Sequence, residues 1–168
     1  MVSKLIAIAA VVFVAGCGYV SKSEYLEHIK TIRVSPVEIQ DADFAYDEAS
    51  QRPYDEVIQE KLIQRFNRKW QDGNDSQFTL RVLDYNIKEH GFGPNGQVEL
   101  LRISLQIEYE FLDRVRNNII AESNNHVQIH DFYIVSNRGE PPETLPQAKG
   151  LLIDELIEDL YNQFAEQW

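Results

Sequence analysis

Two stretches of the chain repeat apolar residues with the period of an α-helix. The first follows Pro53, which suits the first turn of a helix, and ends before Gly73, a common helix terminator. Its apolar stripe consists of Ile58, Leu62, Ile63, Phe66 and Trp70. The second runs from about Gln147 to Phe164, with a stripe of Ile153, Leu156, Ile157, Leu160 and Phe164. We therefore expect two amphipathic helices that pack on a shared core.

The segment from Ile29 to Ile39 is rich in β-branched residues and predicts a first strand. Pro36 lies inside this segment. Because proline has no N–H to donate to a neighbouring strand, the strand either lies at a sheet edge or is interrupted at Pro36. An acidic loop, beginning at Asp41, leads from this strand to the first helix.

A second predicted strand changes the phase of its apolar residues partway along. Phe78, Leu80 and Val82 alternate with polar residues, but the apolar residues that follow are Leu83, Tyr85 and Ile87. Strand side chains alternate between two faces, so this change indicates either a β-bulge or a strand that is covered on both faces.

The clearest strand spans Val98 to Leu112. Its apolar positions are Leu101, Ile103, Leu105, Ile107, Tyr109 and Phe111, and its polar positions are Arg102, Ser104, Gln106, Glu108 and Glu110. This alternation predicts one buried face and one polar face. The glycine-rich segment from Gly91 to Gly96 predicts a hairpin turn before the strand. A second turn from Arg114 to Asn118 leads to a fourth strand from Ile119 to His130.

Together these elements predict an α+β fold. A loop with Pro141, Pro142 and Pro146 separates the fourth strand from the last helix. The expected architecture is a two-layer sandwich of a four-stranded mixed sheet and two helices, in the order β-α-β-β-β-α.

The N-terminus has the pattern of a bacterial lipoprotein signal. Lys4 precedes an apolar run from Leu5 to Val14, which is ten residues long and thus about half of what a membrane-spanning helix needs. The run ends in Val14-Ala15-Gly16-Cys17. The Cys17 thiol would accept a diacylglyceryl group, the small residues before it would fit the signal peptidase, and the freed amine would take a further acyl chain such as palmitate. The alternative interpretation is a short buried helix that ends in Cys-Gly.

The signal pattern divides the chain into three parts. Residues 1–16 form the signal peptide, residues 17–28 a lipidated tether, and residues 29–168 a single folded domain. Cleavage would leave 152 of the 168 residues and, because Lys4 is the only charged residue removed, would change the net charge from −11 to −12. Gly18 follows the cysteine where many inner-membrane lipoproteins have aspartate, so we expect the periplasmic side of the outer membrane.

Composition excludes several classes of function. The net charge of −11, from 16 basic and 27 acidic residues, argues against nonspecific nucleic-acid binding, which needs a basic surface. A single cysteine excludes an internal disulfide and a CxxC zinc site. No serine-histidine-aspartate signature, nucleophile elbow or phosphate loop occurs in the sequence. We therefore expect no enzyme activity, no cofactor and no metal.

Histidines and charged clusters offer weaker candidates. His126 and His130 share a strand face but lie ~13 Å apart, too far to share one metal ion, so we interpret them as surface residues. The acidic residues of the last helix are interpreted as a solvated face rather than catalytic carboxylates. Two basic groups, one of Arg114 and Arg116 and one of Arg65, Arg68 and Lys69, either contact glycolipid phosphates or only keep the protein soluble.

The order of elements and three short sequences resemble the LptE family of lipopolysaccharide-assembly lipoproteins. These sequences are Cys17-Gly18-Tyr19, Ile29-Lys30-Thr31-Ile32 and the Asn95-Gly96-Gln97 turn before a long alternating strand. The resemblance covers nearly all of the chain after the signal. It implies a domain that plugs the lumen of the outer-membrane barrel LptD, helps the barrel assemble and helps lipopolysaccharide reach the cell surface. The family has no catalytic residues.

The resemblance also directs attention to the polar strand face and the turns. Besides lipid attachment at Cys17, the candidate contacts with the barrel or glycolipid are Arg102, Arg114, Arg116, Phe92, Asn95 and Gln97. Phe92, Gly93 and Pro94 occupy the hairpin tip, where a basic residue would suit lipid A phosphates, and Lys88 is the nearest lysine. The alternative function is a lipid-anchored regulator or assembly factor of a periplasmic synthase or secretion system.

Overall fold

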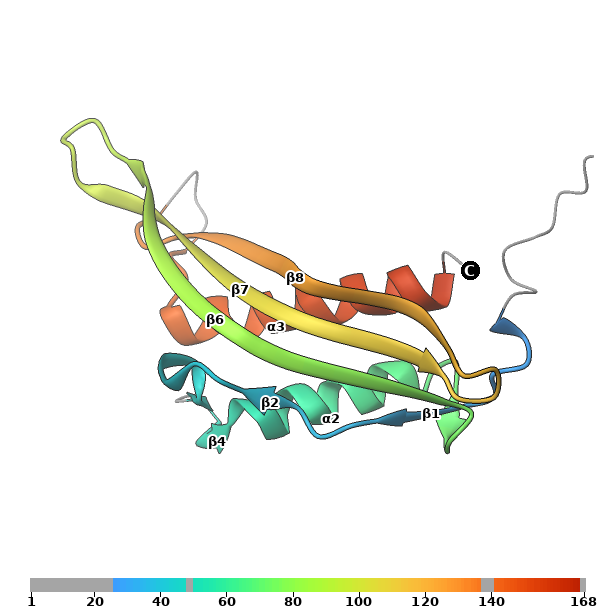
Figure 1. The fold of residues 1–168 in the computed structure, drawn as a ribbon. Coiled ribbons are helices and arrows are strands. Elements are labelled where there is room, and N and C mark those ends of the chain that lie inside the picture. The colour runs from blue at the N-terminus through green and yellow to red at the C-terminus, as the bar shows by residue number, and fades with distance from the viewer. Residues whose placement is uncertain (1–25, 48–49, 137–140, 167–168) are drawn as a thin grey trace, which may run out of the picture.

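A long antiparallel meander dominates the fold (Figure 1). The structure, a computed structural model, describes residues 26–47, 50–136 and 141–166. Among these residues, six strands form a mixed sheet: β1 (Thr31–Val34), β2 (Glu38–Ile39), β5 (Gln71–Asp72), β6 (Ser76–Phe92), β7 (Val98–Asp113) and β8 (Asn118–Tyr133). The sheet order is β5-β1-β6-β7-β8, and β2 also pairs with β6. The α+β class is confirmed, but the predicted number of four strands is wrong.

The extra strands come from short segments that pair in parallel. β1 and β2 both run parallel to β6, and β5 runs parallel to β1. The predicted first strand is interrupted at Pro36, so its two halves become β1 and β2. The backbone N–H of Val37, just after the proline, donates to Oε1 of Gln59 at 2.9 Å instead of to a strand. A two-residue strand has no recognisable period, which is why β5 was not predicted.

Both helices cover the same face of the sheet (Figure 1). α2 (Tyr54–Phe66) ends four residues before Trp70, so the predicted helix was too long. The backbone N–H of Trp70 still donates to the carbonyl of Phe66 at 3.0 Å, which keeps the indole buried in the core after the helix has ended.

α3 (Leu145–Tyr161) begins two residues earlier than predicted. Thr144 and Gln147 form a capping box at its start. Pro146 therefore lies inside the first turn, where its missing N–H costs nothing, and not in the preceding loop. A π-helical turn, η3 (Asn162–Glu166), follows α3 and buries Phe164.

The change of phase in β6 is a β-bulge. Val82 lies opposite Ile107, whereas Tyr85 lies opposite Leu105, so Leu83 is an extra residue on β6. The bulge brings Tyr85 and Ile87, which lie opposite Leu105 and Ile103, onto the same face as Val82. Of the two alternatives left open by the sequence, the bulge is the one that the structure contains.

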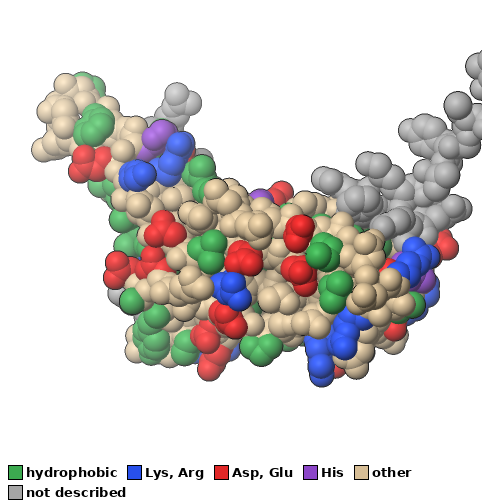
Figure 2. Space-filling view, viewed as in Figure 1, with side chains coloured by type: hydrophobic (Ala, Val, Ile, Leu, Met, Phe, Trp, Pro, Cys, Tyr) green, Lys and Arg blue, Asp and Glu red, His purple; other side chains and the backbone are tan. Residues whose placement is uncertain are grey.

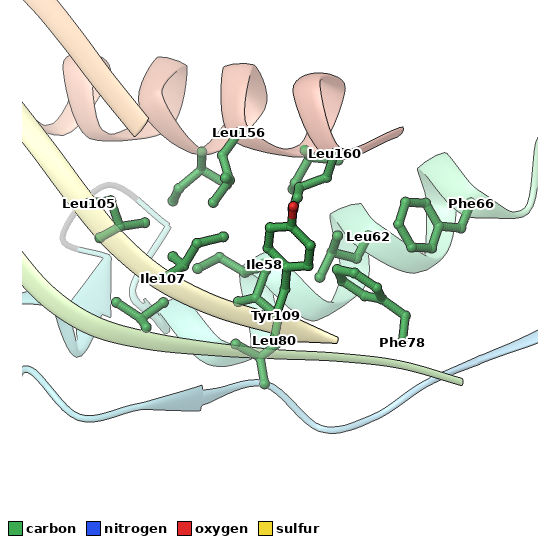
Figure 3. Close-up of a cluster of buried hydrophobic side chains, with 14 of the residues drawn as sticks. Ile58, Leu62, Phe66, Phe78, Leu80, Leu105, Ile107, Tyr109, Leu156 and Leu160 are labelled. Atoms are coloured by element: carbon green, nitrogen blue, oxygen red, sulfur yellow. The ribbon is translucent and has the colours of Figure 1, made fainter. Parts of the chain in front are cut away.

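The core lies between the sheet and the two helices (Figure 3). Its members come from both helices and from the inward faces of β6 and β7. The labelled side chains in Figure 3 are Ile58, Leu62, Phe66, Phe78, Leu80, Leu105, Ile107, Tyr109, Leu156 and Leu160, all buried. Burying each such side chain is worth about 1.5–3 kcal/mol, so this layer is the main source of the domain's stability.

The acidic loop contributes a second aromatic group to the core. It contains the short helix η2 (Ala42–Phe44) and a two-stranded hairpin of β3 (Tyr46–Asp47) and β4 (Arg52–Pro53). Phe44 is fully buried and stacks on Tyr54 and Tyr85, with ring centroids 4.5 and 5.1 Å apart. The loop is therefore packed against the sheet just after the bulge.

Candidate functional site

The face of the sheet opposite the helices is open (Figures 1 and 2). On β7 it presents five partly exposed polar residues, Arg102, Ser104, Gln106, Glu108 and Glu110. Figure 2 shows acidic, basic and apolar side chains mixed across this face. The predicted division of the strand into a buried and a polar face is confirmed.

Charged residues on the open face are paired across strands. Arg81 on β6 donates to Glu38 on β2 and to Glu108 on β7, each at 2.9 Å. The hydrogen bond to Glu38, aided by the negative charge of Glu108, raises the pKa of Arg81. These pairs make the face polar without making it strongly charged at any one point.

The β6–β7 hairpin projects beyond the two helices (Figure 1). At its tip the side chain of Phe92 is 61% exposed. Gly96 has a φ of +76°, which favours glycine, and the N–H of Gly93 donates to the carbonyl of Gln97 at 2.8 Å. Asn95 donates to the side chain of Gln97 at 2.9 Å and accepts from its N–H at 3.2 Å. Asn95 and Gln97 thus hold the turn together, and Phe92 is a large apolar side chain exposed beside it.

A small basic cluster lies just below the tip. Lys88 on β6 lies directly opposite Arg102 on β7. Arg102 donates twice to Asp131 on β8, at 2.6 and 2.7 Å, and once to Nε2 of His90 at 2.8 Å. Hydrogen bonding raises the pKa of Arg102 and lowers the pKa of Asp131. Since like charges opposite each other repel, Asp131 offsets part of the cost of placing Lys88 beside Arg102.

Arg114 and Arg116 lie at the other end of the sheet, in the exposed turn between β7 and β8. Asp113 fixes this turn, because its Oδ1 accepts the backbone N–H groups of Val115 and Arg116 at 2.9 Å. Its Oδ2 lies 2.6 Å from Nε2 of His28. Burial raises the pKa of Asp113, but the hydrogen bonds from Arg116, His28 and Val115 outweigh this effect and keep the pKa below its usual range.

The structure therefore divides the candidate residues into two groups. Phe92, Asn95, Gln97 and Arg102 belong to the projecting hairpin, whereas Arg114 and Arg116 lie near the N-terminal end of the described chain. No single ligand headgroup can contact both groups. Cys17, the predicted lipid attachment residue, lies outside the described residues.

Basic residues in α2 and in the turn after it contact α3 and η3. Arg65 pairs with Glu158 and lies over the ring of Tyr161 at 3.9 Å from its centroid, and Lys69 donates to the carbonyl of Ala165. Arg68 is exposed. The contacts of Arg65 and Lys69 favour a structural role over contact with glycolipid phosphates.

The two histidines on β8 are more enclosed than the sequence suggested. His130 lies between Glu155 of α3 and Glu143, at 3.0 and 3.1 Å, and His126 lies 3.7 Å from Asp159 of α3. Burial lowers the pKa of His130, but its bonds to Glu143 and Glu155 outweigh burial and raise the pKa. Within the described parts of the chain, no group of three potential ligands is arranged to hold a metal ion.

Among residues 26–47, 50–136 and 141–166, no helix combines the length and apolar character needed to cross a membrane.

Sequence reasoning did not bring together Lys88, His90 and Asp131 around Arg102. The opposition of Lys88 and Arg102 depends on the register of the hairpin, which is shifted again between Glu89 and Gly91. Only the glycine at position 91 hinted at this irregularity, since glycine within a strand often accompanies a bulge.

Comparisons with known proteins identify the fold. No protein-family model and no curated protein sequence matches the chain. A hypothetical protein from Chlamydia trachomatis aligns with a TM-score of 0.54 at 10% identity, over 80% of this chain and 95% of that protein. A DUF330-family protein from Xanthomonas campestris aligns with a TM-score of 0.52 at 8% identity, over 77% and 80% of the two chains.

A third solved structure is less similar. It is a minor lipoprotein from Acinetobacter baumannii, which aligns with a TM-score of 0.44 at 15% identity, over 81% of this chain and 92% of that protein. This score is too low to support an inference about fold or function. At the identities of the first two structures, the likeness shows a shared fold alone.

Proposed function

We propose that the chain is a lipid-anchored scaffold of the outer membrane, whose folded domain occupies the lumen of an LptD-like β-barrel and assists the transport of lipopolysaccharide to the cell surface. The observation that carries this proposal is the open face of the sheet, which is polar along β7 and carries the Arg81 ion pairs of β6. The lumen of an outer-membrane barrel is polar, whereas its outer surface is apolar. The domain buries its core between the helices and the sheet and places paired charges on the open face, an arrangement that suits such a lumen.

The length of the hairpin agrees with this position. β6 has 17 residues, which at ~3.3 Å per residue gives a strand of about 55 Å. The apolar band of an outer-membrane barrel is about 25 Å tall. A hairpin of this length extends through the band and past it.

Membrane attachment rests on the sequence. The lipobox at Val14-Ala15-Gly16-Cys17 supports acylation of Cys17, and Gly18 supports sorting to the outer membrane. Acyl chains contribute ~0.8 kcal/mol per buried methylene, so two or three chains anchor a protein durably. The resemblance to the LptE family, carried by Cys17-Gly18-Tyr19 and the Asn95-Gly96-Gln97 turn, agrees with both features.

The projecting hairpin is the part of the domain best suited to glycolipid. Lys88 and Arg102 lie side by side and suit phosphate oxygens, and the exposed ring of Phe92 suits acyl chains. Arg102 already donates to Asp131, so Lys88 is the cation with more freedom to bind a phosphate. Arg114 and Arg116 are separate candidates for contact with the barrel.

Photo-crosslinking in cells tests the barrel assignment. A photoreactive amino acid at Ser104 or Gln106 on the open face should crosslink to a large β-barrel protein, identified by mass spectrometry. The same photoreactive residue at Gln64 on α2, or at Arg68 in the turn after it, is the matched control for a different exposed surface. A stoichiometric barrel in a pull-down of the lipidated protein from detergent-solubilised outer membranes would support the same conclusion.

The alternative function predicts a different partner. Crosslinks from Ser104 and Gln106 to a soluble periplasmic synthase or to a secretion component, with no barrel, would replace the proposal by a regulatory role. Membrane attachment is tested separately with Cys17→Ala, which should leave the membrane fraction, against Ser21→Ala as a control. A Cys17→Ala protein that stays with membranes after a high-salt wash would contradict the lipid anchor.

A further inference from the structure

β8 forms one edge of the sheet: among the described residues, no strand pairs with the side of β8 that faces away from β7. Within the described residues, β8 pairs with β7 alone. Its 16 residues make it as long as β7. Unpaired edges of this length are templates for another strand unless they are blocked by bulges, proline, charges or a covering segment.

Backbone hydrogen bonds show which groups of β8 face outward. The N–H of Ile134 donates to the carbonyl of Glu99, at 3.0 Å, so the backbone groups of Ile134 face β7. Because these groups alternate along a strand, those of Tyr133 face away, and its carbonyl accepts the N–H of Glu143 at 2.9 Å. The same alternation turns the N–H and carbonyl groups of Asp131, Ile129 and Val127 outward.

The two ends of this edge are blocked and its middle is free. Glu143 covers the edge at Tyr133, and a register shift interrupts β8 between Ser123 and His126. Across the described part of the chain, the outward backbone groups from Val127 to Asp131 have no backbone partner. The edge therefore offers one short, well-defined segment for pairing.

The two sides of this segment differ in chemistry. Val127 and Ile129 point toward the open face and are 46% and 44% exposed. On the other side, His126 and His130 face α3, where the side chains of Glu155 and Asp159 lie beside them and are 44% and 56% exposed. A strand added here would place alternate side chains beside an apolar pair and beside two carboxylates.

We propose that the β8 edge from His126 to Asp131 binds an extended segment of a partner protein whose side chains alternate between apolar and basic. The apolar side chains pack on Val127 and Ile129, the basic side chains pair with Glu155 and Asp159, and the outward backbone groups complete the strand pairing. A second copy of this chain is a poorer partner for this edge, because its charge is unfavourable. Two copies would bring their acidic α3 helices together, each on a chain with a net charge of −11.

The proposal is independent of the barrel assignment and can be tested with the purified full-length protein in mild detergent. The probe is a peptide in which lysine alternates with valine, and the matched control replaces every lysine with glutamate. Binding is measured by fluorescence anisotropy and located by hydrogen exchange with mass spectrometry. We expect the lysine peptide alone to bind, with added protection concentrated between His126 and Asp131, and with affinity that falls as salt is raised.

Two variants separate backbone pairing from charge. Ile129→Pro removes an N–H that faces outward and leaves the bonds to β7 in place, so the folded variant should lose peptide binding. Glu155→Gln combined with Asp159→Asn should weaken binding about fivefold. Asp154→Asn combined with Glu158→Gln changes the same number of charges on the side of α3 that faces α2, and should leave binding unchanged.

Several results would overturn the proposal. Equal binding of the lysine and glutamate peptides, protection elsewhere, or full binding by a folded Ile129→Pro variant would each exclude this edge as a basic-strand site. If neither peptide bound the protein, the proposed site would also be excluded. Protection of residues 126–131 that rises with protein concentration, without peptide, would assign the edge to a second copy of the chain instead.

Discussion

The two ends of the β6–β7 hairpin differ in what covers them. Near Ser76 and Asp113 both helices pack on the strands, and Phe78 and Phe111 are at most 1% exposed. Toward the tip, neither α2 nor α3 follows the strands (Figure 1), and Phe92 is 61% exposed. An isolated two-stranded hairpin is marginally stable in water, so the covered end must stabilise the projecting end. One pair of strands thus combines a stability function with a surface for contacts.

The largest expected effect comes from placing charge in the buried middle of the hairpin. Replacing Ile103 and Leu105, both fully buried, with aspartate should prevent folding. Each unpaired buried carboxylate costs several kcal/mol, against a total stability of about 5–15 kcal/mol. Circular dichroism and urea unfolding measure the result. The matched control places aspartate at Ser104 and Gln106, on the open face of the same strand, and should fold. A folded protein with both Ile103→Asp and Leu105→Asp would disprove the assignment of the buried face.

Two phenylalanines compare the ends of the hairpin directly. Phe78→Ala should lower the free energy of unfolding by about 3–5 kcal/mol, because it leaves a cavity beneath both helices. Phe92→Ala should change it by no more than ~0.5 kcal/mol, because the ring is mostly in solvent. Urea unfolding at one pH measures both. If the two variants lost similar free energies of unfolding, the side chain of Phe92 would have to be buried against another part of the molecule.

Asp113 links the covered end to the N-terminal segment through His28. Its pKa is lower in the folded state, so the carboxylate stabilises the fold fully above the unfolded pKa of about 3.9. This contribution is lost as the pH falls further, through the folded pKa. We expect Asp113→Asn to cost about 1–3 kcal/mol at pH 7, since it leaves buried partners unsatisfied.

The control is to measure how the loss of stability caused by Asp113→Asn depends on pH. Asp75 and Asp131 also have lowered pKa values, so the wild type loses stability in acid for several reasons. The informative quantity is therefore the difference in urea midpoint between wild type and Asp113→Asn. This difference should shrink as the pH falls below about 4; a constant difference would show that the charge of Asp113 contributes nothing.

The smallest effect is expected at His130, on β8 opposite Ile103, where the covered part of the sheet meets the projecting part. Its pKa is raised in the folded state by Glu143 and Glu155, so the stabilisation is complete below the unfolded pKa of about 6.5. It is lost as the pH rises through the folded pKa. Melting temperatures should therefore fall between pH 6 and pH 8, by the equivalent of less than ~1 kcal/mol, and His130→Gln should flatten this slope.

Periodic elements could be predicted from the sequence, and short or register-dependent ones could not. The apolar stripes of α2 and α3 and the alternation of β7 each repeat over positions close in the sequence. These elements can therefore be predicted from the sequence pattern alone. β2 to β5 are two residues long, and no period exists in two residues. Local chemistry also decided the helix ends, since the capping box at Thr144 placed Pro146 inside α3.

The candidate site was predictable only where a single strand defines it. The polar face of β7, with Arg102 on it, follows from alternation alone. The position of Lys88 opposite Arg102 needs the hairpin register, and the Arg102–Asp131 pair joins residues 29 positions apart on different strands. His28 and Asp113 are 85 positions apart, and no local pattern relates them.

The parallel pairing of β1 with β6 determines how the molecule bears mechanical load. The described chain begins beside the start of β6, whereas the hairpin tip lies at the far end of that strand (Figure 1). Tension between the N-terminal segment and a partner holding the tip therefore acts along the strands. Such a force shears β1 against β6 and loads all of their hydrogen bonds together, where a perpendicular force would open them one after another. Resistance to forced unfolding is governed by the unfolding rate. We therefore expect the domain to unfold more slowly when pulled along its strands than when pulled across them.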